Sequence, residues 1–229
     1  MVILVTVTPW TLQDIQSRLA ELEGSASDAD AQKARTRHAI LDSASANFVR
    51  HGYRKASVDE IARDAGVAKG TIYLYFDTKT TLLVATVARE KLGLMPQLDA
   101  VMARPELERL EAFIVLTLRF ALTAPLSGML LRGDPDLLRQ LRAATPDGET
   151  DVARDLAFAA DLLATAGVDP AQREALARVL LSVLPLSAHL VDASARLGVD
   201  LDTFVALYGR TLARGLEAAG RPTAQDTAP

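Results

Sequence analysis

Apolar residues recur every three or four positions along most of the chain, which is the spacing of one face of an α-helix. The first such stripe predicts a short amphipathic helix, before the small polar stretch GSASDADAQ at 24–32. Strand-like alternation of apolar and polar residues is nearly absent after residue 10. The chain therefore predicts an all-α protein whose residues 1–32 form an extension with a helix and a linker. The stripe consists of Leu12, Ile15, Leu19 and Leu22.

The next apolar stripe predicts a helix at about 33–50. His51 and Gly52 follow it, and glycine suits the left-handed residue that ends many helices. The stripe consists of Ile40, Leu41, Ala44 and Phe48.

Two shorter helices follow, and a glycine joins them. The second helix begins at a capping box, in which the Ser57 hydroxyl accepts from the Glu60 amide while the Glu60 side chain returns to the serine amide. Gly66 permits a tight turn after two helical turns, and residues 68–75 form the third helix. Two short helices joined in this way are typical of a helix-turn-helix, so we predict a DNA-binding domain at 33–80.

The rest of the chain predicts a larger helical domain at 81–219 for ligand binding and dimerisation. Thr78 begins a helix that runs to about Met95, and Gly, Pro and Asp residues separate the later helices. Residues 220–229 are expected to form a disordered tail. The later helices are predicted at about 105–124, 126–131, 134–143, 151–166, 170–197 and 201–219.

Charge is distributed unevenly along the chain. The net charge of -4 argues weakly against a nucleic-acid partner. Residues 31–92 nevertheless hold eleven Lys or Arg against six Asp or Glu, including all five lysines. A basic segment joined to an acidic remainder is typical of a nucleic-acid-binding module, although chance clustering on a solvated face would give the same pattern.

Composition argues against several other classes of protein. The absence of cysteine excludes disulfides and thiolate chemistry and fits a reducing compartment, so we expect a cytoplasmic protein. The apolar runs at 1–10 and 176–191 are too short to span a membrane, and the first lacks the features of an export signal. The three histidines are widely separated and no catalytic motif occurs. We therefore expect no enzyme activity, no catalytic residue, no metal site and no cofactor.

The sequence GVAKGTIYLYFDTKTTL at 66–82 resembles the DNA-binding domain of the TetR family of transcriptional regulators. The resemblance runs from about Ala34 to Leu82 and rests on a glycine turn, an aromatic pair at a fixed offset, Phe76 and Lys79. Beyond this segment, the chain is similar to the family only in its length and its all-helical pattern.

Three residues depart from the family pattern. Leu74 replaces a polar or aromatic residue, and Ala68 replaces the serine that usually caps the third helix. These two departures put one phosphate contact in doubt. Thr81 replaces an acidic residue, so we expect the fourth helix to lack a capping box.

The third helix carries the candidate DNA contacts. A recognition helix enters the major groove N-terminus first, which brings Lys69, Gly70 and Tyr73 to the base edges. Basic side chains at the start of the first helix are within reach of the adjacent backbone or minor groove. The resemblance implies phosphate contacts from Ser57, Thr71, Tyr75 and Lys79. The basic side chains are those of Lys33, Arg35 and Arg37.

The aromatic residues of this helix have two possible roles. Ile72 and Phe76 share one face and are predicted to close the core of the small domain. Tyr73 and Tyr75 are predicted to face DNA, and the alternative is that both are half-buried packing residues with exposed hydroxyls.

The helix predicted at 105–124 is apolar around most of its circumference, which is typical of a central, buried helix. Arg119 interrupts it, either as a buried anion ligand or as a side chain that reaches the surface. The resemblance implies an effector pocket around such a helix, and an apolar lining suits a small, largely apolar effector. The candidate lining residues are Phe113, Arg119, Phe120, Met129, Phe158 and Leu162.

The last two helices, at about 170–219, have broad apolar faces and the small residues Gly209, Ala213 and Gly215. Their apolar surface exceeds what one modest core needs, so we predict that they pair with a second copy in a four-helix bundle. The resemblance implies the same homodimer. A two-fold dimer also fits a palindromic operator, whose half-sites lie about 34 Å apart.

These features predict a dimeric transcriptional repressor that a small molecule releases from double-stranded DNA. The alternative is a DNA-binding regulator whose second domain only dimerises and binds no effector. Residues 1–30 carry a net charge of -4, which argues against direct DNA contact. They are either an extra helix that packs on the DNA-binding domain or its partner subunit, a disordered arm, or the result of a start codon assigned too far upstream.

Overall fold

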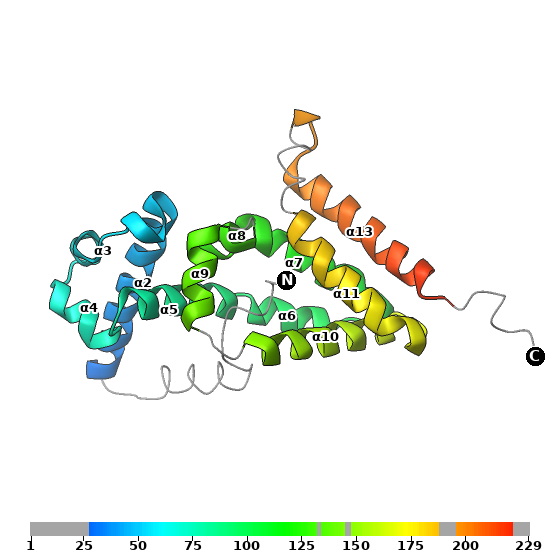
Figure 1. Ribbon diagram of the computed structural model, residues 1–229, viewed down its shortest axis with the longest axis horizontal. Coiled ribbons are helices and arrows are strands. Elements are labelled where there is room, and N and C mark those ends of the chain that lie inside the picture. Colours follow the sequence, from blue (N-terminus) through cyan, green and yellow to red (C-terminus); the bar gives the residue numbers. More distant parts are fainter. Residues whose placement is uncertain (1–27, 132–133, 145–147, 188–195, 222–229) are drawn as a thin grey trace, which may run out of the picture. The chain divides into compact units, whose positions relative to one another are not determined.

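The structure is a computed structural model that describes residues 28–131, 134–144, 148–187 and 196–221 (Figure 1). Every regular element in these ranges is an α-helix, which confirms the all-α prediction. The extension's predicted amphipathic helix lies outside the described residues. The helices are α2 Asp28–Lys55, α3 Val58–Asp64, α4 Lys69–Tyr75, α5 Lys79–Leu92, α6 Met95–Met102, α7 Glu106–Thr123, α8 Pro125–Leu131, α9 Pro135–Ala144, α10 Gly148–Thr165, α11 Pro170–Ser187 and α13 Leu201–Ala219.

The N-terminal helix begins earlier than the sequence pattern predicts. Residues 28–32, assigned to a linker, are the first turn of α2. The helical path breaks at Gly52, where φ is 70° and ψ is 164°, so one further turn follows the predicted end. Glycine adopts this backbone conformation without the steric cost that a side chain would add. Pro96 lies in the first turn of α6, where proline is tolerated because its missing N–H would have no partner within the helix.

The chain divides into two compact units. The HTH unit contains α2 to α5 together with α8 and α9, at 125–144, and the α7 unit contains α6, α7, α10, α11 and α13. The HTH unit is therefore larger than the DNA-binding segment predicted at 33–80, because α8 and α9 pack against α2 and α5.

Polar contacts connect α8 and α9 to the rest of the HTH unit. The Glu90 carboxylate accepts from the first free amides of α8, with Oε1 at 2.9 Å from the Leu126 nitrogen and Oε2 at 2.8 Å from the Ser127 nitrogen. Arg54, beyond the break in α2, pairs with Asp136 in the first turn of α9 at 3.1 Å. Carboxylates near helix N-termini are favoured because the free N–H groups there carry partial positive charge.

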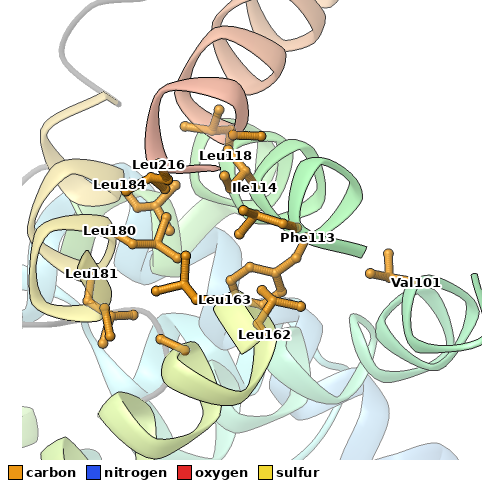
Figure 2. Packing of buried hydrophobic residues seen from close by; sticks show 14 of the residues in the cluster. Val101, Phe113, Ile114, Leu118, Leu162, Leu163, Leu180, Leu181, Leu184 and Leu216 are labelled. Carbon is orange, nitrogen blue, oxygen red and sulfur yellow. The ribbon is translucent and has the colours of Figure 1, made fainter. Parts of the chain in front are cut away.

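The α7 unit is built around a continuous apolar core, in which α7 contacts α6, α11 and α13 (Figure 2). Phe113 points toward Leu162 and Leu163 of α10 in this view. The central, buried position predicted for α7 agrees with this packing. The residues of the core include Leu110, Ile114, Leu118, Leu163, Leu180 and Leu184.

The apolar face of α13 is used inside the α7 unit. Phe204, Val205 and Leu216 belong to the core, so the prediction that this face is surplus and waits for a second copy is wrong. The close approach predicted at Gly209 occurs within the chain, because a Cβ there would lie 2.7 Å from Val115 Cγ2 of α7. Gly215, in contrast, lies next to open space.

The C-terminal end of α13 also differs from expectation. Gly220, assigned to a disordered tail, is buried, and its carbonyl accepts from the Asp169 amide at 2.9 Å. The tail prediction is therefore wrong at this residue, and residues 222–229 lie outside the described ranges. Across the described ranges, no helix combines the length and the hydropathy that crossing a lipid bilayer requires.

Candidate nucleic-acid interface

The helix-turn-helix begins at Ser57, the N-cap residue of α3. The Ser57 hydroxyl accepts from the Glu60 amide at 3.4 Å, as the capping box predicts. The turn after α3 contains Gly66 with φ of 68°, the left-handed conformation expected for a glycine between two short helices. This turn leads directly to α4.

Asn47 accepts the hydrogen bond from the Ser57 amide that the predicted capping box assigned to the Glu60 side chain. The Ser57 amide donates to Asn47 Oδ1 at 3.1 Å, and Asn47 Nδ2 donates to Glu60 Oε2 at 3.2 Å. The glutamate therefore reaches the N-cap through a buried amide of α2 rather than directly. Sequence reasoning missed this residue, and its signal was a polar side chain beside the apolar stripe of the first helix.

The helix α4 has a buried face and an exposed face. Ile72 and Phe76 are buried, which confirms their predicted core positions. Tyr73 has 43% of its surface exposed, whereas Tyr75 is half-buried with its ring centroid 6.4 Å from that of Phe76. A Cβ at Gly70 would meet no atom within 4 Å. The structure therefore places Lys69, Gly70 and Tyr73 together on the exposed part of the helix.

The Lys69 ammonium pairs with a carboxylate from α3. Its Nζ lies 2.8 Å from Asp59 Oδ2, and both side chains are exposed. The hydrogen bond to Asp59 raises the pKa of Lys69, so the side chain is fully charged at neutral pH. Asp59 was not predicted as a site residue. It holds the lysine at the start of α4 in the absence of DNA.

Lys79 occupies a more enclosed position. Its ammonium donates to the Ala56 carbonyl at 3.1 Å and to the Arg54 carbonyl at 3.3 Å, and it lies 4.5 Å from the ring centroid of Tyr53. Partial burial lowers the pKa of Lys79. An ammonium has three N–H donors, so these two carbonyls leave one donor for a phosphate. Lys79 thus joins the end of α2 to the start of α5.

The basic residues of α2 have different environments. Arg37 is half-buried, with its guanidinium carbon 5.6 Å from the ring centroid of Phe76. Arg35 is exposed and donates to Gln32 Oε1 at 3.0 and 3.2 Å, and Lys33 is exposed. Arg37 therefore supports the core of the small domain, while the other two residues remain at the surface.

The N-terminal ends of α4 and α5 are capped differently. Ala68 provides no side-chain cap to α4, as predicted. The prediction that α5 lacks a capping box is wrong, because Thr78 Oγ1 accepts from the Thr81 amide at 3.0 Å and Thr81 Oγ1 accepts from the Thr78 amide at 2.9 Å. A threonine hydroxyl accepts a hydrogen bond at this position as a glutamate does, although its side chain is shorter.

Residues 40–86 match the family model described as bacterial regulatory proteins, tetR family. These residues therefore form a TetR-family DNA-binding domain. The matched residues run from the middle of α2 into α5 and include the whole helix-turn-helix. The protein that carries this domain is a DNA-binding transcriptional regulator.

Two curated relatives agree with this assignment. The chain is 28% identical over 179 residues to an uncharacterized HTH-type transcriptional regulator from Mycobacterium tuberculosis H37Rv, covering 69% of this chain and 89% of that protein. It is 44% identical over 54 residues to the fatty acid metabolism regulator protein of Bacillus subtilis strain 168, which covers 24% of this chain and only 27% of that protein.

Two solved structures have the same fold. The complex of SmeT with triclosan has a TM-score of 0.62 at 23% identity, covering 82% of this chain and 93% of SmeT. The regulator FadR from Bacillus subtilis, in complex with stearoyl-CoA, has a TM-score of 0.58 at 20% identity, covering 79% and 97%. At these identities, the similarity supports the fold alone.

The six candidate effector residues belong to both units of the chain. Phe113, Phe158 and Leu162 lie together in the α7 unit, where the two phenylalanine ring centroids are 5.4 Å apart. Phe120 is half-buried elsewhere on α7, and Met129 belongs to α8 of the HTH unit. Arg119 reaches the surface and pairs with Asp202 at 2.7 Å, which decides between the two roles considered for it.

A hollow of about 640 Å³ lies on the α7 unit, between α6, α7 and α13. Arg119 is the one candidate effector residue among those that line it. The apolar part of its wall includes Leu107, Val115 and Leu116, and Arg104 and Glu111 add charge. Within the described ranges, no cluster of three or more His, Asp or Glu residues could hold a metal ion.

Proposed function

We propose that the exposed face of α4 contacts the bases of a palindromic operator and that the start of α3 contacts the adjacent phosphates. The observation that carries this proposal is the joint exposure of Lys69, Gly70 and Tyr73 on one helix. Lys69 exchanges its pairing with Asp59 for guanine acceptors, and Gly70 allows the backbone to approach the groove closely. Ser57, Thr71, Tyr75 and Lys79 supply the phosphate contacts, with Lys33, Arg35 and Arg37 of α2 near the adjacent backbone.

The test begins with the selection of binding sites from a random duplex pool by the intact protein. Lys69→Ala and Tyr73→Ala are each expected to weaken binding to the selected site by about tenfold. Arg196→Ala, an exposed substitution that lies before α13, is the control for a lost positive charge and is expected to bind as the unaltered protein does. Unaltered binding by both α4 variants would refute the site assignment.

We propose that a small, largely apolar molecule releases this regulator from DNA. The support is the apolar character of the α7 unit and the two similar proteins whose structures hold stearoyl-CoA and triclosan. Either ligand presents a large apolar surface, which a site in an apolar helical domain would bury. Repression then ends when the ligand favours a conformation that binds DNA less well.

The effector proposal is tested by thermal unfolding with stearoyl-CoA and triclosan as probes. A ligand that binds only the folded protein at 100 times its Kd raises the free energy of unfolding by about 2.7 kcal/mol. Such a ligand is also expected to weaken operator binding by about 5- to 150-fold. If neither probe, nor any of a panel of acyl chains and apolar aromatic compounds, shifts Tm or operator affinity, the alternative of a second domain that only dimerises is favoured.

We propose that the regulator acts as a homodimer through α11 and α13, in the cytoplasm where the chromosome lies. Val179 of α11 and Leu207 of α13 are 46% and 58% exposed, and they supply apolar surface that is not used within the α7 unit. Val179→Asp and Leu207→Asp are expected to convert dimers to monomers, as measured by light scattering, with Ala157→Asp, at an exposed position of α10, as the control. An unchanged mass for both variants would place the interface elsewhere.

A further inference from the structure

Leu74 is an apolar residue on the exposed face of the recognition helix. It is 85% exposed, more than any other large hydrophobic residue of the described chain. Single exposed leucines are common on protein surfaces, so exposure alone carries no conclusion. What distinguishes Leu74 is its place on the helix.

Successive residues of an α-helix are about 100° apart, so Leu74 points about 160° away from both Ile72 and Phe76. These two residues form the buried face of α4. Leu74 therefore lies at the centre of the face that is most distant from the protein core. A groove that receives this exposed face of α4 therefore meets the Leu74 side chain on the side away from the protein core.

The residues around Leu74 suit contact with base edges. Gly70 lies one turn earlier on the same side, with no atom within 4 Å of a Cβ placed there. Tyr73 flanks this line on one side, and Thr71 and Tyr75 flank it on the other. The polar side chains at the flanks reach the donors and acceptors of the groove and its walls, while the centre is apolar.

We propose that Leu74 contacts the 5-methyl group of a thymine in each operator half-site and makes this base pair a preferred position. A leucine has no donor or acceptor for a phosphate or a polar base edge, and the thymine methyl is the apolar group that the major groove presents. This inference rests on the proposed DNA-binding face. It adds a specificity-determining residue at a position where the family pattern has a polar or aromatic side chain.

The chemistry of the contact explains why it discriminates between bases. Burial of one methyl group against Leu74 removes both apolar surfaces from water. Cytosine at the same position has no methyl group, and the purines present polar groups there. A gain of about fourfold in affinity per half-site corresponds to roughly 0.8 kcal/mol for one buried methyl group.

The experiment replaces single thymines of the selected operator with deoxyuridine, which removes only the methyl group. In each half-site, one substitution is expected to weaken the binding of the unaltered protein about fourfold, and about sixteenfold when both half-sites carry it. Deoxyuridine at the other thymines of the same operator is the control. Leu74→Ala is expected to bind the thymine and the deoxyuridine duplexes equally, which closes a double-mutant cycle.

A second variant controls for the loss of an exposed leucine. Leu107→Ala, on the α7 unit, removes a leucine that is 75% exposed and is expected to keep the full sensitivity to deoxyuridine. Circular dichroism of Leu74→Ala is expected to match that of the unaltered protein, because the side chain contributes little to the core.

Three outcomes overturn the inference. The first is a Leu74→Ala variant that keeps the fourfold sensitivity, and the second is an operator in which no thymine shows any sensitivity. Both leave the proposed function intact if Lys69→Ala still weakens binding. The third is a pool that yields no enriched sequence, and this result refutes the proposed function itself.

Discussion

The two units of the molecule are held together in different ways. In the HTH unit, named polar groups join one helix to the next, such as Lys79 to the end of α2 and Glu90 to the start of α8. In the α7 unit, longer helices share one apolar core, and glycine allows α13 to lie close to α7. Ion pairs there, such as Arg119 with Asp202, lie at the surface.

Helix length explains the contrast. Helices α3 and α4 have seven residues each and bury only a few side chains, so packing alone holds them weakly. The orientation of α3 depends in addition on the hydrogen bonds at its N-terminal end. Helices of eighteen or nineteen residues, such as α7 and α13, bury enough apolar surface for packing to fix their positions. A surface that must fit a DNA groove is thus placed by directional contacts, whereas the α7 unit depends on shape and volume.

The contrast is tested most strongly by Leu118→Ala in the α7 unit. Leu118 is fully buried, so the substitution leaves a cavity and is expected to lower the free energy of unfolding by about 3 kcal/mol. Urea unfolding followed by circular dichroism measures this change. Leu107→Ala, with an exposed leucine on the same helix, is expected to change stability by less than about 0.5 kcal/mol. Equal effects for the two variants would contradict the conclusion that buried apolar side chains stabilise the α7 unit.

The next largest effect is expected for Glu90→Ala in the HTH unit. The substitution removes the acceptor of two amides at buried residues, Leu126 and Ser127, and is expected to cost about 2 kcal/mol of unfolding free energy. Hydrogen exchange at these two amides is expected to rise. Glu108→Ala, on the exposed side of α7, is the matched control. Unchanged protection in Glu90→Ala would show that packing alone holds α8.

A smaller effect is expected for Asn47→Ala. This side chain joins Ser57 to Glu60, and its loss leaves a backbone donor without its acceptor, at a cost of about 1.5 kcal/mol. Chemical denaturation measures the cost, and Gln97→Ala is an exposed amide control. If Asn47→Ala were as stable as the control, the hydrogen bonds of Asn47 would not be what holds the start of α3 in place.

The smallest change in the free energy of unfolding is expected for Ala68→Ser, and it is a gain rather than a loss. Helix α4 begins without a side-chain cap, and a serine hydroxyl at its N-cap is expected to raise the free energy of unfolding by about 0.5 to 1 kcal/mol. Thermal unfolding detects this gain as a higher Tm. Ala46→Ser, at an exposed position within α2, is expected to give no gain. A lower Tm for Ala68→Ser would show that the end of α4 is constrained by its surroundings.

The sequence predicted the HTH unit well where the signal is local. A capping serine, a glycine turn and the burial of Ile72 and Phe76 all depend on neighbours within a few residues. Contacts between distant segments were missed, because Asn47 gives no local sign that it accepts from Ser57 ten residues later. The second capping box was missed for another reason, since the pattern favours glutamate and a threonine pair satisfies the same amides.

The α7 unit was predicted less completely. Periodicity identified its helices and the buried character of α7, yet it did not say which partner each apolar face would meet. The face of α13 was assigned to a second copy and instead packs on its own unit. The candidate effector residues share one difficulty, because an apolar side chain that lines a cavity and one that fills a core have the same sequence pattern. Phe113 and Phe158 illustrate this ambiguity.

The contact between Gly209 and Val115 limits how this protein can evolve. Every substitution of a glycine adds a side chain, and at residue 209 its first carbon would come within 2.7 Å of Val115 Cγ2. Valine has few rotamers and cannot move this methyl group aside without strain. A larger residue at 209 therefore requires a smaller one at 115, and the two positions are expected to covary among descendants of this sequence.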